Sequence, residues 1–184
     1  MPGSVIGTKM GLGFPGTYAR SGDFLVGNHF VQATDDNGPQ FGEPVVGNAD
    51  NTVTSVKDYV STSPAGTFTA AKFKGVAVRE VKTITTYQVG TQEQTQYNPG
   101  DPCDVLKRGH VSVVCQLGTP VAEGAVYVRV EANDSYPTAV VGGFEYRTDT
   151  DSSKCVLLTN CQWATGEIDA NKVCELAILY PLNA

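Results

Sequence analysis

The sequence predicts an all-β fold: a small barrel, jelly roll or sandwich of short antiparallel strands, with an extended N-terminal arm rich in glycine and proline. Three observations lead to this prediction. Apolar and polar residues alternate along short segments of residues 71–184, turn-forming residues separate these segments, and no apolar period of 3.6 residues persists for three turns. Many short strands with regular turns are typical of sandwiches and barrels, and the pattern leaves the strand order open.

Residues 1–22 form the predicted arm, in which glycine and proline recur (Pro2, Gly3, Gly7, Gly11, Gly13, Pro15, Gly16, Gly22). The segment has too few large apolar side chains to offset its ordering entropy alone, so we expect a disordered tail or an arm that orders on a partner. The large apolar side chains of the arm are its expected interface residues. They are Val5, Ile6, Met10, Leu12, Phe14 and Tyr18.

Residues 23–184 are expected to form a single β-domain, and residues 23–70 are its irregular portion. Short strand-like pieces at residues 24–26 and 30–31 alternate there with clusters of turn formers, such as residues 35–39. Asp and Asn side chains bond their own backbone and Gly accepts positive φ, so this acidic cluster is interpreted as a turn and not as a cation site.

Residues 71–184 contain the main strands, because the apolar period there is two. Val111, Val113 and Cys115 share one predicted face, while His110 and Ser112 lie on the opposite face. Val, Thr and Tyr, which suit a pleated and half-buried surface, dominate these segments. The predicted strands cover residues 76–81, 83–89, 110–117, 126–131, 144–147, 155–158 and 174–180.

Composition argues against several classes of partner. The net charge is −6, with 13 basic and 19 acidic residues, so the clustered Lys and Arg that bind duplex phosphates or anionic membranes are missing. No window approaches the roughly 20 apolar residues of a membrane-spanning helix, and no signal peptide is evident. We therefore expect a soluble protein made in a cytosol, whose five cysteines are reduced structural thiols.

The sequence also predicts no catalytic, cofactor or metal site. The two histidines are His29 and His110, and neither lies in a recognisable catalytic motif. Cysteine and histidine lack zinc-site spacing, and glycine motifs that bind phosphate are absent. Residues 149–153 resemble the opening of a calcium loop, but the glycine and glutamate that complete it are missing. These absences favour a non-enzymatic structural protein.

Four segments, in this order, resemble the structural cement or head decoration proteins of tailed bacteriophages. They are FKGVAVREV at residues 73–81, YNPGDPCDVLKRGHV at 97–111, GAVYVRV at 124–130, and ATG at 164–166 with AIL at 177–179. The resemblance covers residues 20–184 and is strongest over residues 73–131. It consists of strand and turn patterns, so it offers no active site to transfer.

The resemblance implies a virion protein that binds the outer surface of an assembled capsid and cements neighbouring major capsid protein subunits. It implies self-association as well, as a homotrimer or a dimer. An arm such as residues 1–22 would bind by pairing with an exposed strand edge. Two alternatives stay open: a phage tail or fibre component, against which the lack of internal repeats argues, and a carbohydrate-binding β-module, which would need its tyrosines gathered on one sheet.

Overall fold

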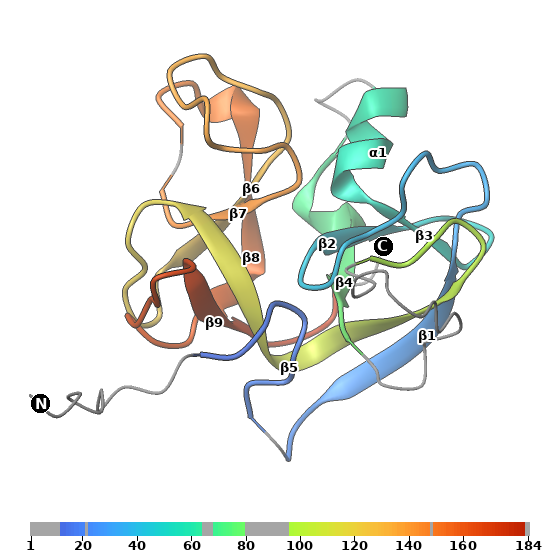
Figure 1. Ribbon diagram of the computed structural model, residues 1–184, viewed down its shortest axis with the longest axis horizontal. Coiled ribbons are helices and arrows are strands. Elements are labelled where there is room, and N and C mark those ends of the chain that lie inside the picture. Colours follow the sequence, from blue (N-terminus) through green and yellow to red (C-terminus); the bar gives the residue numbers. More distant parts are fainter. Residues whose placement is uncertain (1–11, 21, 64–67, 80–95, 148, 183–184) are drawn as a thin grey trace, which may run out of the picture.

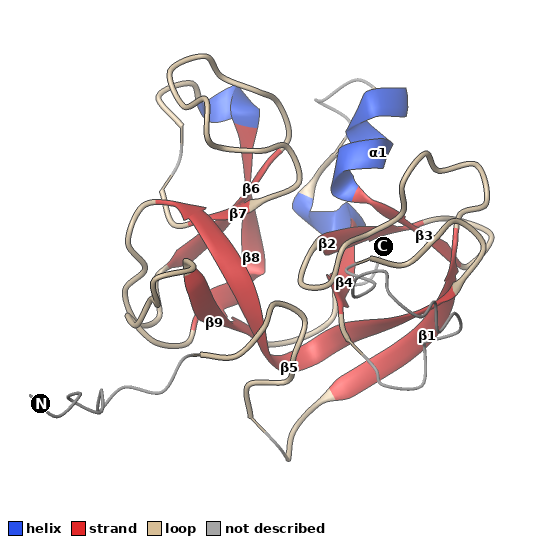
Figure 2. Cartoon of the chain, viewed as in Figure 1, coloured by secondary structure: helices blue, strands red, loops and turns tan. Residues whose placement is uncertain are grey.

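The computed structural model describes residues 12–20, 22–63, 68–79, 96–147 and 149–182. Over these residues the fold is all-β with one short α-helix, which confirms the predicted fold class (Figure 2). The strands are β1 (Leu25–Val31), β2 (Pro44–Gly47), β3 (Thr52–Ser55), β4 (Phe73–Ala77), β5 (Pro102–Leu117), β6 (Ala125–Arg129), β7 (Phe144–Glu145), β8 (Cys155–Trp163) and β9 (Val173–Ile178). The helices are α1 (Val56–Thr62) and the 3₁₀ turns η2 (Ala70–Lys72) and η4 (Ser152–Lys154).

The strands close into two rings that share β5. The first ring runs β1–β3–β2–β4–β5 and closes by pairing β5 with β1. The second ring runs β5–β7–β6–β8–β9 and closes by pairing β9 with β5. In Figure 1, β5 extends from one group of strands to the other, with β1–β4 and α1 on the right and β6–β9 on the left.

The number of strands in each ring dictates one feature of the topology. Strands around a closed ring of five cannot alternate in direction throughout, so each ring needs a parallel pair. The parallel pair is β1–β3 in the first ring and β5–β7 in the second, and every other pairing is antiparallel. The predicted fold of short antiparallel strands therefore also contains these two parallel pairs, which the sequence did not reveal.

Gly109 marks the point where β5 passes from the first ring to the second. Arg108 pairs with Leu25 of β1, whereas Gly109 pairs with Ile178 of β9. The φ of Gly109 is 123°, which disfavours any residue with a side chain. A Cβ atom here would also lie 2.9 Å from the carbonyl oxygen of Asp23. Glycine thus permits both the bend in β5 and the close approach of the chain entering β1.

The larger hydrophobic core fills the second ring and continues to the contact between the rings. Its second-ring members include Val111, Val113 and Cys115, so the predicted face of this strand is confirmed. The first ring contributes outward-facing side chains such as Val46 and Val76 to the same cluster. A smaller core fills the first ring itself (Val31, Val45, Val53, Ala77, Tyr97, Cys103, Val105). One apolar cluster therefore joins the two rings into a single body.

Helix α1 follows β3 directly and packs its buried Val56 against the larger core. The Ser55 hydroxyl accepts a hydrogen bond from the backbone N–H of Asp58 at 3.0 Å, which is a typical N-cap. Seven residues are too few for a helix to be stable in isolation, so tertiary packing must hold α1 in place.

Most predicted strands are present, with changed limits. β5 begins at Pro102 and β8 ends at Trp163, so both are longer than predicted, whereas β2 and β3 were not predicted. The predicted strand at residues 83–89 lies outside the described residues, as does the end of the one at residues 76–81. All five cysteines are buried free thiols. No helix in the described part of the chain is long and apolar enough to cross a membrane.

We expect Gly109→Ala to lower the free energy of unfolding by about 1–3 kcal/mol, because it combines an unfavourable φ with a steric clash. Gly100→Ala is the matched control, since Gly100 has a φ of 83° but no atom lies within 4 Å of the position that its Cβ would take. Urea unfolding of both variants measures the difference. Equal losses for the two would show that crowding at Gly109 contributes nothing.

Candidate interaction surface

Residues 12–20 belong to the predicted arm and are here called the arm root. They run along β5 and attach the arm to the body. The N–H of Gly16 donates to the carbonyl of Ser112 at 2.8 Å, and the N–H of Ser112 donates to the carbonyl of Thr17 at 2.9 Å. Tyr18 forms an antiparallel bridge with Val111. The arm root therefore occupies the edge of β5 between the positions where β4 and β7 pair.

Contacts on the other side fix the arm root against the first ring. The N–H of Arg79 donates to the carbonyl of Gly16 at 2.8 Å. Gly16 has a φ of 80°, and a Cβ atom there would lie 2.9 Å from the backbone nitrogen of Gly42. Gly42 in turn leaves no room for a side chain beside Pro15. The backbones of the arm root and of residues 41–42 pack so closely that glycine is required on both.

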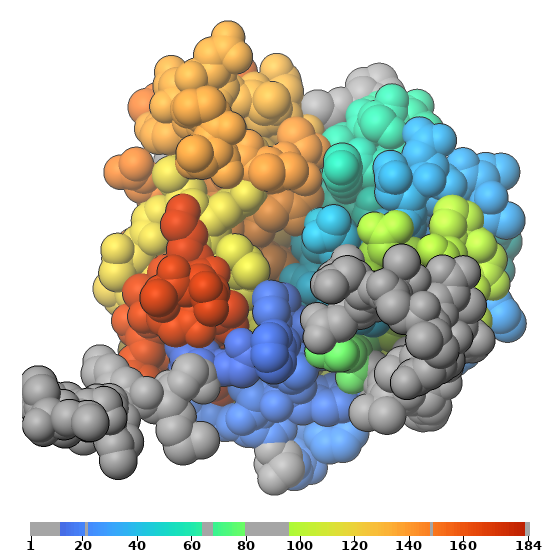
Figure 3. Space-filling view, in the orientation of Figure 1, coloured from blue at the N-terminus to red at the C-terminus, as the bar shows by residue number. Residues whose placement is uncertain are grey.

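Arg20 ends the arm root with an ion pair to β9. Its guanidinium donates twice to the carboxylate of Glu175, at 2.5 and 3.2 Å. His110 Nδ1 lies 2.7 Å from the same carboxylate, whose side chain is 10% exposed. The hydrogen bond and the charge of Glu175 raise the pKa of Arg20. Figure 3 shows the blue arm root lying next to the red surface formed by the C-terminal strands.

Exposed aromatic side chains surround this junction. The rings of Tyr18 and Phe24 stack with centroids 5.1 Å apart. Phe24 is 49% exposed and Phe14 is 69% exposed. Large apolar groups this accessible, next to a segment expected to bind a partner, are typical of an interaction surface.

The predicted interface residues fall into two groups. Val5, Ile6 and Met10 lie outside the described residues. Among those in the arm root, Leu12 and Tyr18 are half-buried, and Tyr18 packs against the larger core. Phe14 is turned to solvent.

Sequence reasoning did not find the residues that hold the arm root, namely Arg20, Arg79, Ser112 and Glu175. Most of their contacts use backbone atoms or join positions far apart in the chain, so no local pattern marks them. The period-two alternation did place Ser112 on the face opposite the core, where it bonds the arm root.

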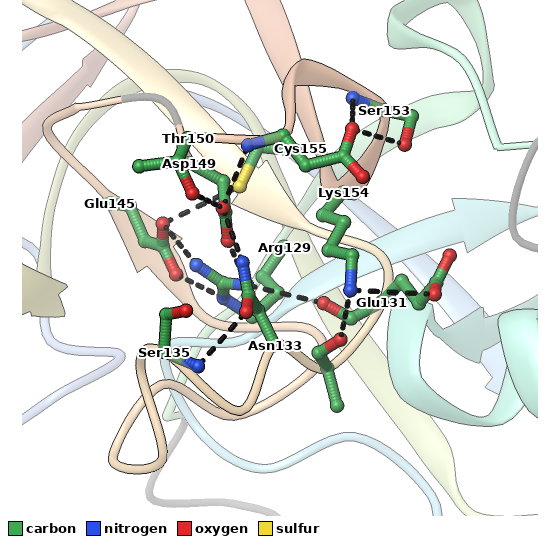
Figure 4. A network of polar contacts seen from close by, with 12 residues as sticks. Arg129, Glu131, Asn133, Ser135, Glu145, Asp149, Thr150, Ser153, Lys154 and Cys155 are labelled. Carbon is green, nitrogen blue, oxygen red and sulfur yellow. Dashed lines mark hydrogen bonds and ion pairs between the residues drawn. The ribbon is translucent and has the colours of Figure 1, made fainter.

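A buried ion network joins β6, β7 and the loops on either side of β7 (Figure 4). Arg129, with no exposed surface, makes a bidentate pair with Glu145 at 2.6 and 3.1 Å and a further pair with Asp149 at 2.7 Å. Asn133 and the N–H of Asp151 also donate to Asp149. The network fastens the loops on either side of β7 to β6.

The same contacts set the pKa values of the network. Burial by itself raises the pKa of Asp149, but hydrogen bonds from the Asp151 N–H, Arg129 and Asn133 outweigh it and hold the pKa well below its ordinary range. Burial lowers the pKa of Arg129, and the bonds to Glu145 and Asp149 raise it further than burial lowers it. Arg129 and Asp149 therefore stay charged at neutral pH, and the network is structural.

A shallow hollow beside α1 gathers carboxylates, including Glu43 and Asp58. Asp35 lies near them, and burial raises its pKa to about 6, with the charge of Asp58 adding to the effect. The Thr54 hydroxyl donates to one oxygen of Asp35 at 3.3 Å, and the other oxygen is buried without a partner. The described residues hold no group of three side chains suited to bind a metal ion.

The histidines have partners that do not suggest nucleophilic catalysis. His29 Nδ1 lies 3.1 Å from the carbonyl oxygen of Asn51, and His110 contacts Glu175. Within the part of the chain that the structure describes, neither imidazole is hydrogen-bonded to a hydroxyl or thiol. A histidine that activates a nucleophile needs such a bond.

Comparisons with known proteins match nearly the whole chain. A family model described as XM1 gp53 minor capsid protein matches residues 3–178. A solved chain from "The capsid of Myoviridae Phage XM1" is similar in fold, with a TM-score of 0.61 over 96% of this chain and 96% of that chain. The two share 15% sequence identity, so this likeness concerns the fold. No curated protein matches the chain.

We expect Arg129→Met to lower the free energy of unfolding by about 3–5 kcal/mol, because two carboxylates would lose their buried counter-ion. Lys154→Met is the control, since Lys154 pairs with a half-exposed Glu131 at 3.7 Å. Loss of this exposed ion pair should lower the free energy of unfolding by less than about 1 kcal/mol. Chemical denaturation at pH 7 measures both. Comparable losses would contradict a special role for the buried network.

We expect Asp35→Asn to stabilise the protein at pH 7.5 by about 1 kcal/mol, a figure reduced because partial exposure screens the charge. The folded-state pKa of about 6 lies above the ordinary 3.8, so wild-type Asp35 disfavours folding increasingly as pH rises through this interval. Well below pH 3.8 the carboxyl is neutral in both states, and the two proteins should unfold alike. A stability difference that stays the same from the acid limit to pH 7.5 would contradict this assignment.

Proposed function

The chain belongs to the XM1 gp53 minor capsid protein family, and from this membership we propose that it binds the outer surface of an assembled phage head and cements neighbouring major capsid protein subunits. It is thus a structural protein of the virion capsid, which confirms the resemblance to capsid-associated phage proteins. The outer position, the bridging role and the absence of enzymatic activity belong to the proposal.

The observation that carries the proposal is the anchorage of the arm root. Residues 12–20 are bonded to β5 on one side and to Arg79 on the other, so residues 1–11 are joined to a firmly held segment. A partner bound to residues 1–11 would then be linked to both rings through β5. We propose that Val5, Ile6 and Met10 contact the neighbouring subunit, with the arm backbone pairing to an exposed strand edge.

The exposed aromatic groups extend the proposed contact onto the body. Phe14 belongs to the arm root, and Phe24 precedes β1, so both adjoin the path of the arm. Apolar and aromatic side chains near the centre of an interface supply most of its binding energy. Self-association, as a homotrimer or a dimer, would place several arms around one symmetry axis of the shell.

The test is to incubate purified protein with heads that lack it, sediment the particles and count bound copies. We expect saturable binding at a copy number that matches an icosahedral symmetry class. A variant lacking residues 1–11 should keep the β-fold, because the rings and the arm root are intact, yet bind at least tenfold more weakly.

A second variant keeps the arm length and changes Val5, Ile6 and Met10 to Ser. Its control is Val140→Ser, which removes a 57% exposed apolar side chain from a loop of the second ring. Loss of binding in the arm variant alone supports the proposal. Full binding after deletion of residues 1–11 would remove the arm from the mechanism, and no binding of the intact protein would refute attachment to the outer surface.

A further inference from the structure

Basic side chains converge at one end of the first ring. The β1–β5 register pairs Gly27 with Val105 and His29 with Cys103, so these residues share the inner face, and Lys107 is the next residue of β5 on it. A Cβ atom at Gly27 would lie 2.5 Å from Lys107 Nζ and 3.1 Å from His29 Nε2. Both nitrogens therefore border the same small volume above Gly27.

Lys74 approaches from the opposite side of the ring. Its side chain lies over Gly47 of β2, where a Cβ atom would be 3.0 Å from Lys74 Cδ. Its ammonium is near enough for its charge to lower the pKa values of both Lys107 and His29, in addition to the larger effect of burial. Glycine at positions 27 and 47 thus leaves room for two lysine side chains at this end of the ring.

These basic groups lack a counter-charge within the described residues. Neither Lys74 nor Lys107 takes part in an ion pair there. His29 is 5% exposed, and its Nε2 is buried without a hydrogen-bond partner. Holding two half-buried ammonium groups together without an anion costs free energy, in a chain whose net charge is −6. Such an arrangement is characteristic of a binding site.

The tautomer of His29 restricts the anion that fits. Its Nδ1 lies 3.1 Å from the carbonyl oxygen of Asn51, which can only accept, so Nδ1 carries the proton. In the neutral imidazole, Nε2 is then an acceptor. A suitable ligand presents negative oxygens to the two ammonium groups and a hydroxyl group to Nε2. Hydrogen phosphate has both, whereas sulfate, carboxylates and fully ionised phosphate monoesters lack the hydroxyl.

We propose that His29, Lys74 and Lys107 form a binding site for inorganic hydrogen phosphate at one end of the first ring. On binding, the Lys107 side chain moves away from the space above Gly27 that it fills. The two ammonium groups then donate to the charged oxygens of the ion, and its P–OH group donates to His29 Nε2. The site lies on the first ring and uses none of the residues assigned to the arm. It would stabilise the first ring by neutralising the repulsion between the lysines.

Isothermal titration calorimetry of the full chain with sodium phosphate, at pH 7.5 and constant ionic strength, tests the site. We expect saturable binding of phosphate and at least tenfold weaker binding of sulfate, acetate and methyl phosphate. Equal affinities for phosphate and sulfate would overturn the proposed role of the hydroxyl group. No saturable binding of phosphate would overturn the site itself.

Variants locate the binding. Lys107→Met and Lys74→Met keep most of the aliphatic side chain and should each weaken phosphate binding at least tenfold, while their circular dichroism spectra match that of wild type. Lys57→Met, which changes an exposed lysine on α1, should bind phosphate as wild type does. Phosphate binding that survives in both Lys74→Met and Lys107→Met would place the ion elsewhere and refute the proposal.

Discussion

The structure depends on the sharing of one strand by two closed rings. The first half of β5 pairs with β1 and β4, and its second half pairs with β9, the arm root and β7. Its backbone groups are therefore satisfied by five segments from across the chain. A single β-strand crossing the molecule couples the two ring cores, so neither ring is an independent unit.

Charged side chains in the second ring and at the arm root form ion pairs. Within the second ring, Arg129 is buried with two carboxylates and its charge is fully compensated. At the arm root, Arg20 and His110 both meet Glu175 across β5 and β9. The two lysines at the end of the first ring and the half-buried Asp35 take part in no ion pair within the described residues.

Sequence patterns located the strands that have one apolar face and missed the others. β5, β6 and β9 alternate in residue type over five or more residues, whereas β2 and β3 are four residues each, too short for a period of two to be recognised. Arg129 alternates with valines, and no local pattern reveals that carboxylates from β7 and the loop after it surround its side chain. The arm interface was predicted from its apolar residues, but backbone hydrogen bonds to β5 leave no signature in the sequence.

Ring closure has a consequence for contacts between copies of the protein. Each of the described strands pairs on both sides, so neither ring presents a strand with a wholly free edge. Free edges are what allow β-proteins to join one another in uncontrolled stacks. The closed rings thus protect copies of the protein from aggregating through their strands, and any strand exchange between copies is left to the segments that lie outside the rings.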